Sequence, residues 1–169
     1  MIRIGSVEIR GSSSFCRNVR RYWRQASAKN VDGGFTILQN SNLPIYIYQS
    51  PWPQVEIYDR RNQDGSINVI RVHICFNHKL YIHEGARIVA PQFALYHEIG
   101  HAASYVKNPI AYKRRRQERA AGNWWKNDEE YRCIMEDENA ARRAFGVAEK
   151  KEFCKSFAMV LPKRRCVRK

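Results

Sequence analysis

Residues 91–106 constrain the chain most, because their pattern predicts a helix with polar chemistry on one side and apolar side chains on the other. Pro91 suits the first position of a helix, and Lys107-Asn108-Pro109 predicts its end. Each helical residue turns about 100°, so His101 lies about 40° from His97. The apolar residues gather on the opposite side, at about 140–200°: Leu95, Ile99, Ala102 and Val106. We therefore expect this helix to bury one face in a core and to line a cleft with the other.

The polar face carries the sequence His97-Glu98-Ile99-Gly100-His101, which is an HExxH motif. In a helix this spacing places two imidazoles one turn apart with a carboxylate beside them, the arrangement of a catalytic zinc site. A chance match is expected in on the order of one chain in a few hundred of this length. The motif predicts His97 and His101 as Zn²⁺ ligands and Glu98 as the general base of a metallopeptidase.

A catalytic zinc site needs a third protein ligand and one open position. A second predicted helix, over residues 127–145, supplies the candidates. Glu130 is the preferred third ligand, because it lies in the middle of the apolar face, where a carboxylate is costly unless it meets a cation or a metal. Glu138, about 80° away, is the alternative, and Asp137, about 20° away, is a candidate acceptor for an imidazole N–H group. Two further acids are expected to face away toward solvent: Glu129 and Glu136.

Outside these two helices the pattern favours short strands and one more helix, so we predict a single α+β domain over residues 1–169. A small mixed sheet is expected to pack against the HExxH helix and the ligand-bearing helix, as in zincin metallopeptidases. Lys113-Arg114-Arg115-Arg116 is expected to be a mobile segment, and residues 163–169 a basic tail. The predicted helix covers residues 15–28, and the predicted strands are 7–9, 35–38, 45–48, 55–58 and 67–76, with 35–38 and 45–48 paired as a hairpin.

The chain is strongly basic, because 30 Lys and Arg residues outnumber 16 Asp and Glu residues and give a formal charge of +14. Such a surface attracts nucleic acid, anionic membranes or acidic proteins, including an acidic substrate or a neutralising partner. Nucleic-acid binding, alone or as a means of localising a protease, is the alternative function. It explains the charge but leaves the HExxH motif as a coincidence. The residues that favour it are Arg17, Arg20, Arg21 and Arg24, interleaved with Tyr22 and Trp23, together with Lys113 to Arg116 and the basic tail at 163–169.

Two further features bear on where the chain works. No apolar run approaches the roughly 20 residues of a membrane span, and the opening residues lack the apolar core of a cleavable signal peptide. The five cysteines are an odd number without a CxxC pair, which favours unpaired thiols in a reducing cytosol. If the chain is exported, we expect a route that needs no cleavable signal.

Several motifs in this order resemble the NleD-like zinc metallopeptidases, which bacteria deliver into host cells as effectors or fuse to larger toxins. A similar order, HExxH, then EExR, then ENxxR, occurs in clostridial neurotoxin light chains, and it implies Glu130 as a zinc ligand. The spacer between the two acidic motifs is short, so both are expected on one continuous helix. The resemblance covers roughly residues 7–146 and rests on Val7-Glu8-Ile9-Arg10-Gly11-Ser12, the stretch 90–102, Glu129-Glu130 with Arg132, and Glu138-Asn139-Ala140-Ala141-Arg142.

The same resemblance implies a substrate and a place of action. The implied activity is cleavage of a protein in the cytoplasm of a target cell, either a host signalling protein or a protein of a rival bacterium. A tetrahedral oxyanion would also need a hydrogen-bond donor. Arg142, Tyr131 and Tyr112 are the candidates, and the sequence does not choose among them.

Overall fold

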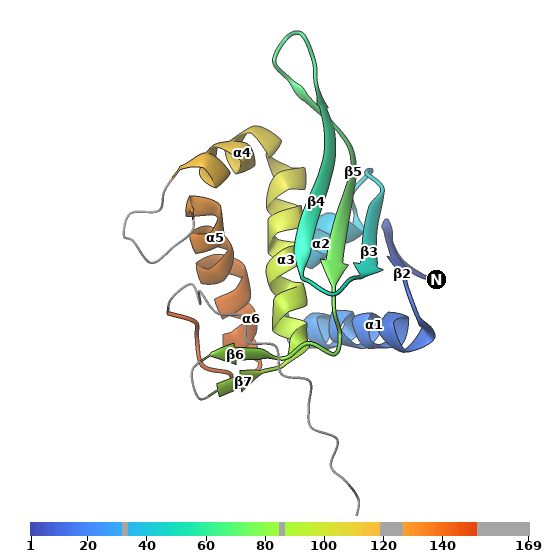
Figure 1. Ribbon diagram of the computed structural model, residues 1–169, viewed down its shortest axis with the longest axis vertical. Coiled ribbons are helices and arrows are strands. Elements are labelled where there is room, and N and C mark those ends of the chain that lie inside the picture. The colour runs from blue at the N-terminus through green and yellow to red at the C-terminus, as the bar shows by residue number, and fades with distance from the viewer. Residues whose placement is uncertain (32–33, 85–86, 119–126, 152–169) are drawn as a thin grey trace, which may run out of the picture.

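The computed structural model describes residues 1–31, 34–84, 87–118 and 127–151, and the expected basic tail at residues 163–169 lies outside them. The described chain is α+β, as predicted, with a small mixed sheet beside a group of helices (Figure 1). A separate two-stranded ribbon, β6 (Ile82–Glu84) with β7 (Arg87–Val89), lies near the end of the last helix. None of the described helices combines the length and the apolar character needed to cross a membrane.

The main sheet has five strands in the order β1-β2-β3-β5-β4. The central strands β2 (Val7–Arg10), β3 (Ile45–Gln49) and β5 (Ile67–Phe76) are parallel. Strands β1 (Ile2–Ile4) and β4 (Gln54–Arg61) pair antiparallel at the two edges. These positions confirm the strands predicted at 7–9, 45–48, 55–58 and 67–76. The inward side chains of the central strands are completely buried: Val7, Ile9, Ile45, Ile47, Val72 and Ile74.

Two helices pack against this sheet. Helix α1 (Ser13–Ala28) begins where the Ser12 side chain accepts a hydrogen bond from the Phe15 N–H group, and it lies beside β2. Helix α3 (Pro91–Lys107) lies beside β4 and β5, and it is the predicted HExxH helix. The core is formed where the apolar faces of both helices meet the sheet. The buried residues of α1 include Phe15, Val19, Tyr22, Trp23 and Ala26.

Residues 35–38 were predicted as a strand, and this prediction is wrong, because they lie in helix α2 (Gly34–Gln39). The Phe35 ring meets Trp23 at 4.7 Å and Tyr96 at 5.3 Å between ring centroids. Packing of these rings against α1 and α3 outweighs the local preference of the segment for a strand. The predicted hairpin is therefore absent, and β3 pairs with β2 and β5 instead.

Lys113-Arg114-Arg115-Arg116 is also corrected, since it belongs to helix α4 (Pro109–Gln117) rather than to a mobile segment. Pro109 follows the end of α3, as predicted, but it also starts the next helix. A proline is suited to a first helical turn, where its missing N–H group is not needed. The Asn108 side chain caps α4 by accepting a hydrogen bond from the Ala111 N–H group at 2.9 Å.

The second predicted helix is present as one continuous run with an irregular centre. It consists of α5 (Asp128–Arg132), a π-helical segment η1 (Cys133–Glu138) and α6 (Asn139–Ala144). In η1 the Asn139 N–H group donates to the Ile134 carbonyl, five residues back. A π-segment accommodates one extra residue in a helix, so it changes which side chains face α3.

Candidate metal centre

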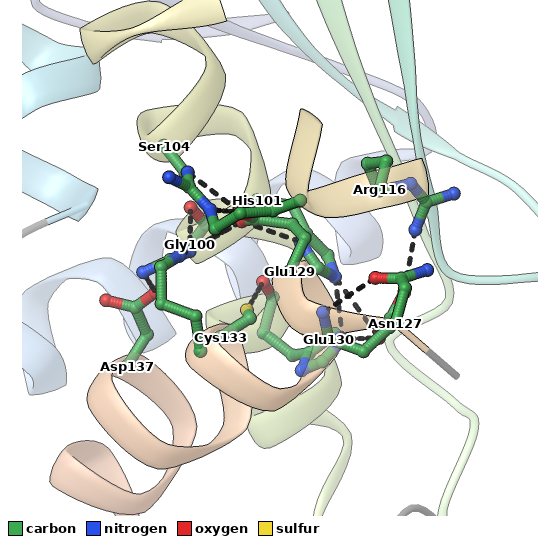
Figure 2. A network of polar contacts seen from close by, with 12 residues as sticks. Gly100, His101, Ser104, Arg116, Asn127, Glu129, Glu130, Cys133 and Asp137 are labelled. Carbon is green, nitrogen blue, oxygen red and sulfur yellow. Dashed lines mark hydrogen bonds and ion pairs between the residues drawn. The ribbon is translucent and has the colours of Figure 1, made fainter. Parts of the chain in front are cut away.

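Three ligand atoms from two helices converge between α3 and α5. His97 and His101 extend from α3 with their Nε2 atoms 3.0 Å apart. The Glu130 Oε2 atom of α5 lies 3.1 Å from the first of these nitrogens and 3.4 Å from the second. His101 and Glu130 are seen within the surrounding network of polar contacts in Figure 2.

The size of this triangle fits a metal ion. Three ligands held tetrahedrally at 2.0–2.1 Å from zinc are about 3.3 Å from one another. The observed separations of 3.0, 3.1 and 3.4 Å agree with that value. Two imidazole nitrogens and a carboxylate oxygen all carry lone pairs, so they gain from a shared cation at the centre. Of the residues predicted as ligands, the structure brings together His97, His101 and Glu130.

The other nitrogen of each imidazole meets a buried carboxylate. His97 Nδ1 lies 3.2 Å from Glu138 Oε2, and His101 Nδ1 lies 3.4 Å from Glu129 Oε1. The contact of His101 Nδ1 with Glu129 is a hydrogen bond, and an N–H group donated there fixes the tautomer, so that the Nε2 lone pair points into the triangle. Glu129 therefore orients His101 from behind, whereas Glu138 lies at ion-pair distance from His97 Nδ1 without a hydrogen bond to it.

These contacts correct two predictions. Asp137 was the expected acceptor for an imidazole, but it forms an ion pair with Arg132 at 2.9 Å instead. Glu129 was expected to face solvent, but it is completely buried. The error at Asp137 comes from treating the whole helix as regular, whereas the π-segment changes the direction of its side chains. Glu129 precedes that segment, and its carboxylate is buried where it pairs with Arg115 of α4 and with Arg132. Glu136 is exposed, as predicted.

Arginines from helices α4 and α5 neutralise the carboxylates. Arg115 Nε and Arg132 Nη2 lie 2.6 and 2.8 Å from the two oxygens of Glu129. Burial alone would raise the pKa of Glu129, but hydrogen bonds with His101, Arg132 and Arg115 lower it to about 2. Arg116 donates to Glu130 Oε1 at 2.8 Å, which leaves Oε2 directed at the imidazoles (Figure 2).

The three candidate ligands themselves have shifted pKa values. Burial acts to raise the pKa of Glu130, yet hydrogen bonds with His101 and His97 hold it far below its usual range. Burial acts to lower the pKa of both histidines, but the adjacent Cys133 thiol and the carboxylates raise it well above the usual value. The site therefore has a strong demand for positive charge, which protons or a metal ion can meet.

Glu98 faces a cavity of about 370 Å³ beside the ligand triangle. Only 8% of this residue is exposed, and burial raises the pKa of its carboxyl group. The cavity reaches from the metal position to the start of β4. Its wall includes Trp52 and Pro53 just before β4, Gln54 and Val55 at the start of β4, and Tyr112, Arg116, Glu138 and Lys150.

The expected oxyanion donors lie in different places. Arg142 is 1% exposed and is held by Glu138 at 2.6 Å and Glu84 at 2.6 Å, and it is not among the described residues that line the cavity. Tyr131 is 44% exposed on α5 and also lies outside the described cavity wall. Tyr112, the third candidate, is part of that wall. Arg116, which was expected to be mobile, lines it as well.

Cys133 is a site residue that the sequence did not identify. It is buried, and its thiol donates to the His97 carbonyl at 3.0 Å. Its sulfur and one nitrogen of each imidazole lie within 4.8 Å of one another, so His97, His101 and Cys133 form a possible metal-binding group. Cys133 follows Glu130 by three residues and so lies on the same face of the helix, which is the sequence signal that could have identified it. Cys16, Cys75 and Cys133 are all buried free thiols.

Comparisons with protein-family models, with curated proteins and with solved structures find no match for this chain. Its function is therefore inferred from the chemistry of the centre between α3 and α5.

Proposed function

We propose that this chain is a zinc-dependent endopeptidase in which His97, His101 and Glu130 hold the metal. The single observation that supports this best is the triangle of ligand atoms at 3.0–3.4 Å, with the Glu98 carboxylate in the adjoining cavity. Two imidazoles and one carboxylate are a donor set that suits zinc. The cavity on one side leaves room for water and substrate, which is typical of catalytic rather than structural zinc sites.

Each residue has a defined task in this proposal. Zinc, when bound, supplies a Lewis acid that polarises a carbonyl group and acidifies water. Glu98 takes the proton from the attacking water and passes it to the departing amine. Tyr112 and Arg116 are donors in the cavity wall that can stabilise the oxyanion. Burial raises the pKa of Tyr112, which keeps its hydroxyl group protonated as a donor.

The position of the cavity favours a peptide as substrate. Strand β4 is an edge of the sheet, and residues at its start line the cavity. An edge strand has unpaired backbone N–H and C=O groups along one side. An extended peptide can pair with such an edge, which would place its backbone across the metal position. The proposed target is a protein in the cytoplasm of another cell.

The test compares the zinc-loaded protein with its Glu98→Gln variant in two lysates, one eukaryotic and one bacterial. New protein N-termini are identified by mass spectrometry, and bound zinc is measured by elemental analysis. We expect about one zinc per chain in both proteins, and cleavage only with the unchanged protein. Cleavage that persists at full rate in Glu98→Gln would exclude Glu98 as the base. Absence of cleavage in both lysates by a fully zinc-loaded protein would argue for a metal-binding role instead.

A further inference from the structure

Helix α1 carries four arginines in one row, Arg17, Arg20, Arg21 and Arg24, which we name the arginine stripe. Their spacing of three, four and seven residues places them on one face of the helix, over a length of about 10 Å. All four are exposed, and they line a shallow groove together with Ile2, Gln25 and Ala28. The stripe therefore forms a compact, concave cationic surface on the side of α1 that faces away from the core.

The charge of the stripe is not balanced by the part of the protein that the structure describes. Within that part, no carboxylate forms an ion pair with any of its four guanidinium groups. Arg21 contacts only the Asn18 amide oxygen, at 2.8 Å, and the Tyr22 ring. No acidic residue occurs in the sequence from Ile9 to Val31. By contrast, Arg115, Arg116, Arg132 and Arg142 around the metal centre each pair with a glutamate.

The neighbouring side chains narrow the choice of anionic partner. A membrane-binding helix inserts an apolar face, but the apolar face of α1 is buried in the core. A protein interface usually centres on a large apolar or aromatic anchor, and α1 has no exposed large hydrophobic side chain. Its exposed face instead combines arginine with Ser14, Gln25 and Ser27. Arginine, glutamine and serine are the side chains that bind phosphates and the edges of bases.

We propose that the arginine stripe binds the phosphate backbone of nucleic acid. The planar guanidinium group donates two parallel hydrogen bonds to a phosphate, and four such groups in a row match a repeating anion. This inference is independent of the proposed peptidase activity, because the stripe uses no residue of the metal centre.

The test measures binding of the full chain to a labelled 20-base-pair DNA duplex of random sequence by fluorescence anisotropy, between 50 and 200 mM salt. The variant is Arg20→Gln with Arg24→Gln. The matched control is Arg60→Gln with Arg61→Gln on β4, which removes the same charge from another exposed pair. Thermal unfolding of both variants verifies that the surface changes leave the fold intact.

We expect a dissociation constant in the micromolar range or tighter at 100 mM salt. Each phosphate contact adds about 0.9 to the steepness of log affinity against log salt. The stripe variant lacks two arginines, so this slope should be less steep by about 2. The control should keep the slope of the unchanged chain. Absence of DNA binding, or an equal loss in both variants, would overturn the proposal. Displacement of DNA by polyglutamate at equal concentration would also overturn it, in favour of an acidic polypeptide as partner.

Discussion

Three glutamates on one helical run provide a graded test of the metal centre. Glu130→Gln removes a charged ligand atom that lies 3.1 and 3.4 Å from the imidazole nitrogens. Glu138→Gln leaves the proposed ligand atoms in place but removes the carboxylate charge that lies 3.2 Å from His97 Nδ1 and 2.6 Å from Arg142. Loss of such an outer partner typically costs 10–100-fold in metal affinity, about 1.4–2.7 kcal/mol, whereas loss of the direct ligand should exceed about 100-fold. Glu136→Gln is the matched control, because its side chain is 67% exposed, and its zinc affinity should not change.

Zinc affinity is measured by competition with a chromogenic chelator, with circular dichroism as a check on folding. The expected order of loss is Glu130→Gln, then Glu138→Gln, then Glu136→Gln. A larger loss for Glu138→Gln than for Glu130→Gln would refute the assignment of Glu130. Cys133→Ser distinguishes the alternative donor set, and a loss as large as that of Glu130→Gln would make the thiol a ligand.

Three further substitutions test contacts that stabilise the fold around the site. Gly100→Ala should destabilise the fold by about 1–3 kcal/mol, measured by denaturant unfolding, because an added Cβ would lie 2.8 Å from Cγ of Asp137. Arg142→Gln should cost about 3–5 kcal/mol and lower the unfolding temperature by on the order of 10 °C, since it leaves the buried Glu138 without its main partner. Burial acts to raise the pKa of Asp59, but hydrogen bonds from α4 and α3 hold it below the usual value. Asp59→Asn should therefore destabilise the protein at pH 7. The difference should begin to shrink as the pH falls below about 4, and it should be lost as the pH falls through the lowered pKa of Asp59 in the folded protein.

Much of the fold follows from periodicity alone. The HExxH helix was predictable because its apolar residues recur on one side, and the structure buries Leu95 and Ile99 there. The central strands were predictable because their apolar residues alternate. The order of the strands was not, since it depends on which edges meet after the helices pack. Residues 35–38 were misassigned for the same reason, because the aromatic contacts that hold them come from distant segments.

The candidate site was predictable as far as the three side chains that we propose as metal ligands, and not beyond. The pair of histidines follows from a spacing of four in a helix, and Glu130 follows from its place on an apolar face. The cations that neutralise the site could not be anticipated. Arg115 and Arg116 belong to a run that resembles a solvated segment, yet α4 directs both at the glutamates of α5. Only the tertiary fold decides which surface charges become partners of a buried site.

The π-segment explains why Glu138, and not Asp137, faces His97. In a regular α-helix Glu138 would lie about 80° from Glu130, and one residue fewer would bring it to about −20°. Counting one residue fewer also moves Arg142 from about 120° to about 20° around the helix axis from Glu130. This position agrees with the burial of Arg142 beside Glu138. The π-segment therefore has the effect of one inserted residue. Met135 lies within it and is 39% exposed, so its deletion removes one residue without removing a buried side chain.

Deletion of Met135 should convert the run into a regular α-helix in which Glu130 and Glu138 keep their positions. Zinc affinity should then remain within about tenfold of the unchanged chain, less than the typical loss of an outer carboxylate. Deletion of Ala140 is the control, because α6 is already regular there. Removing one residue there turns Arg142 by about 100°, which should cost about 3 kcal/mol or more through the unpaired Glu138. If the two deletions lower zinc affinity and stability equally, the π-segment itself positions the side chains of the site. A shift of one residue along the helix would then not explain the site.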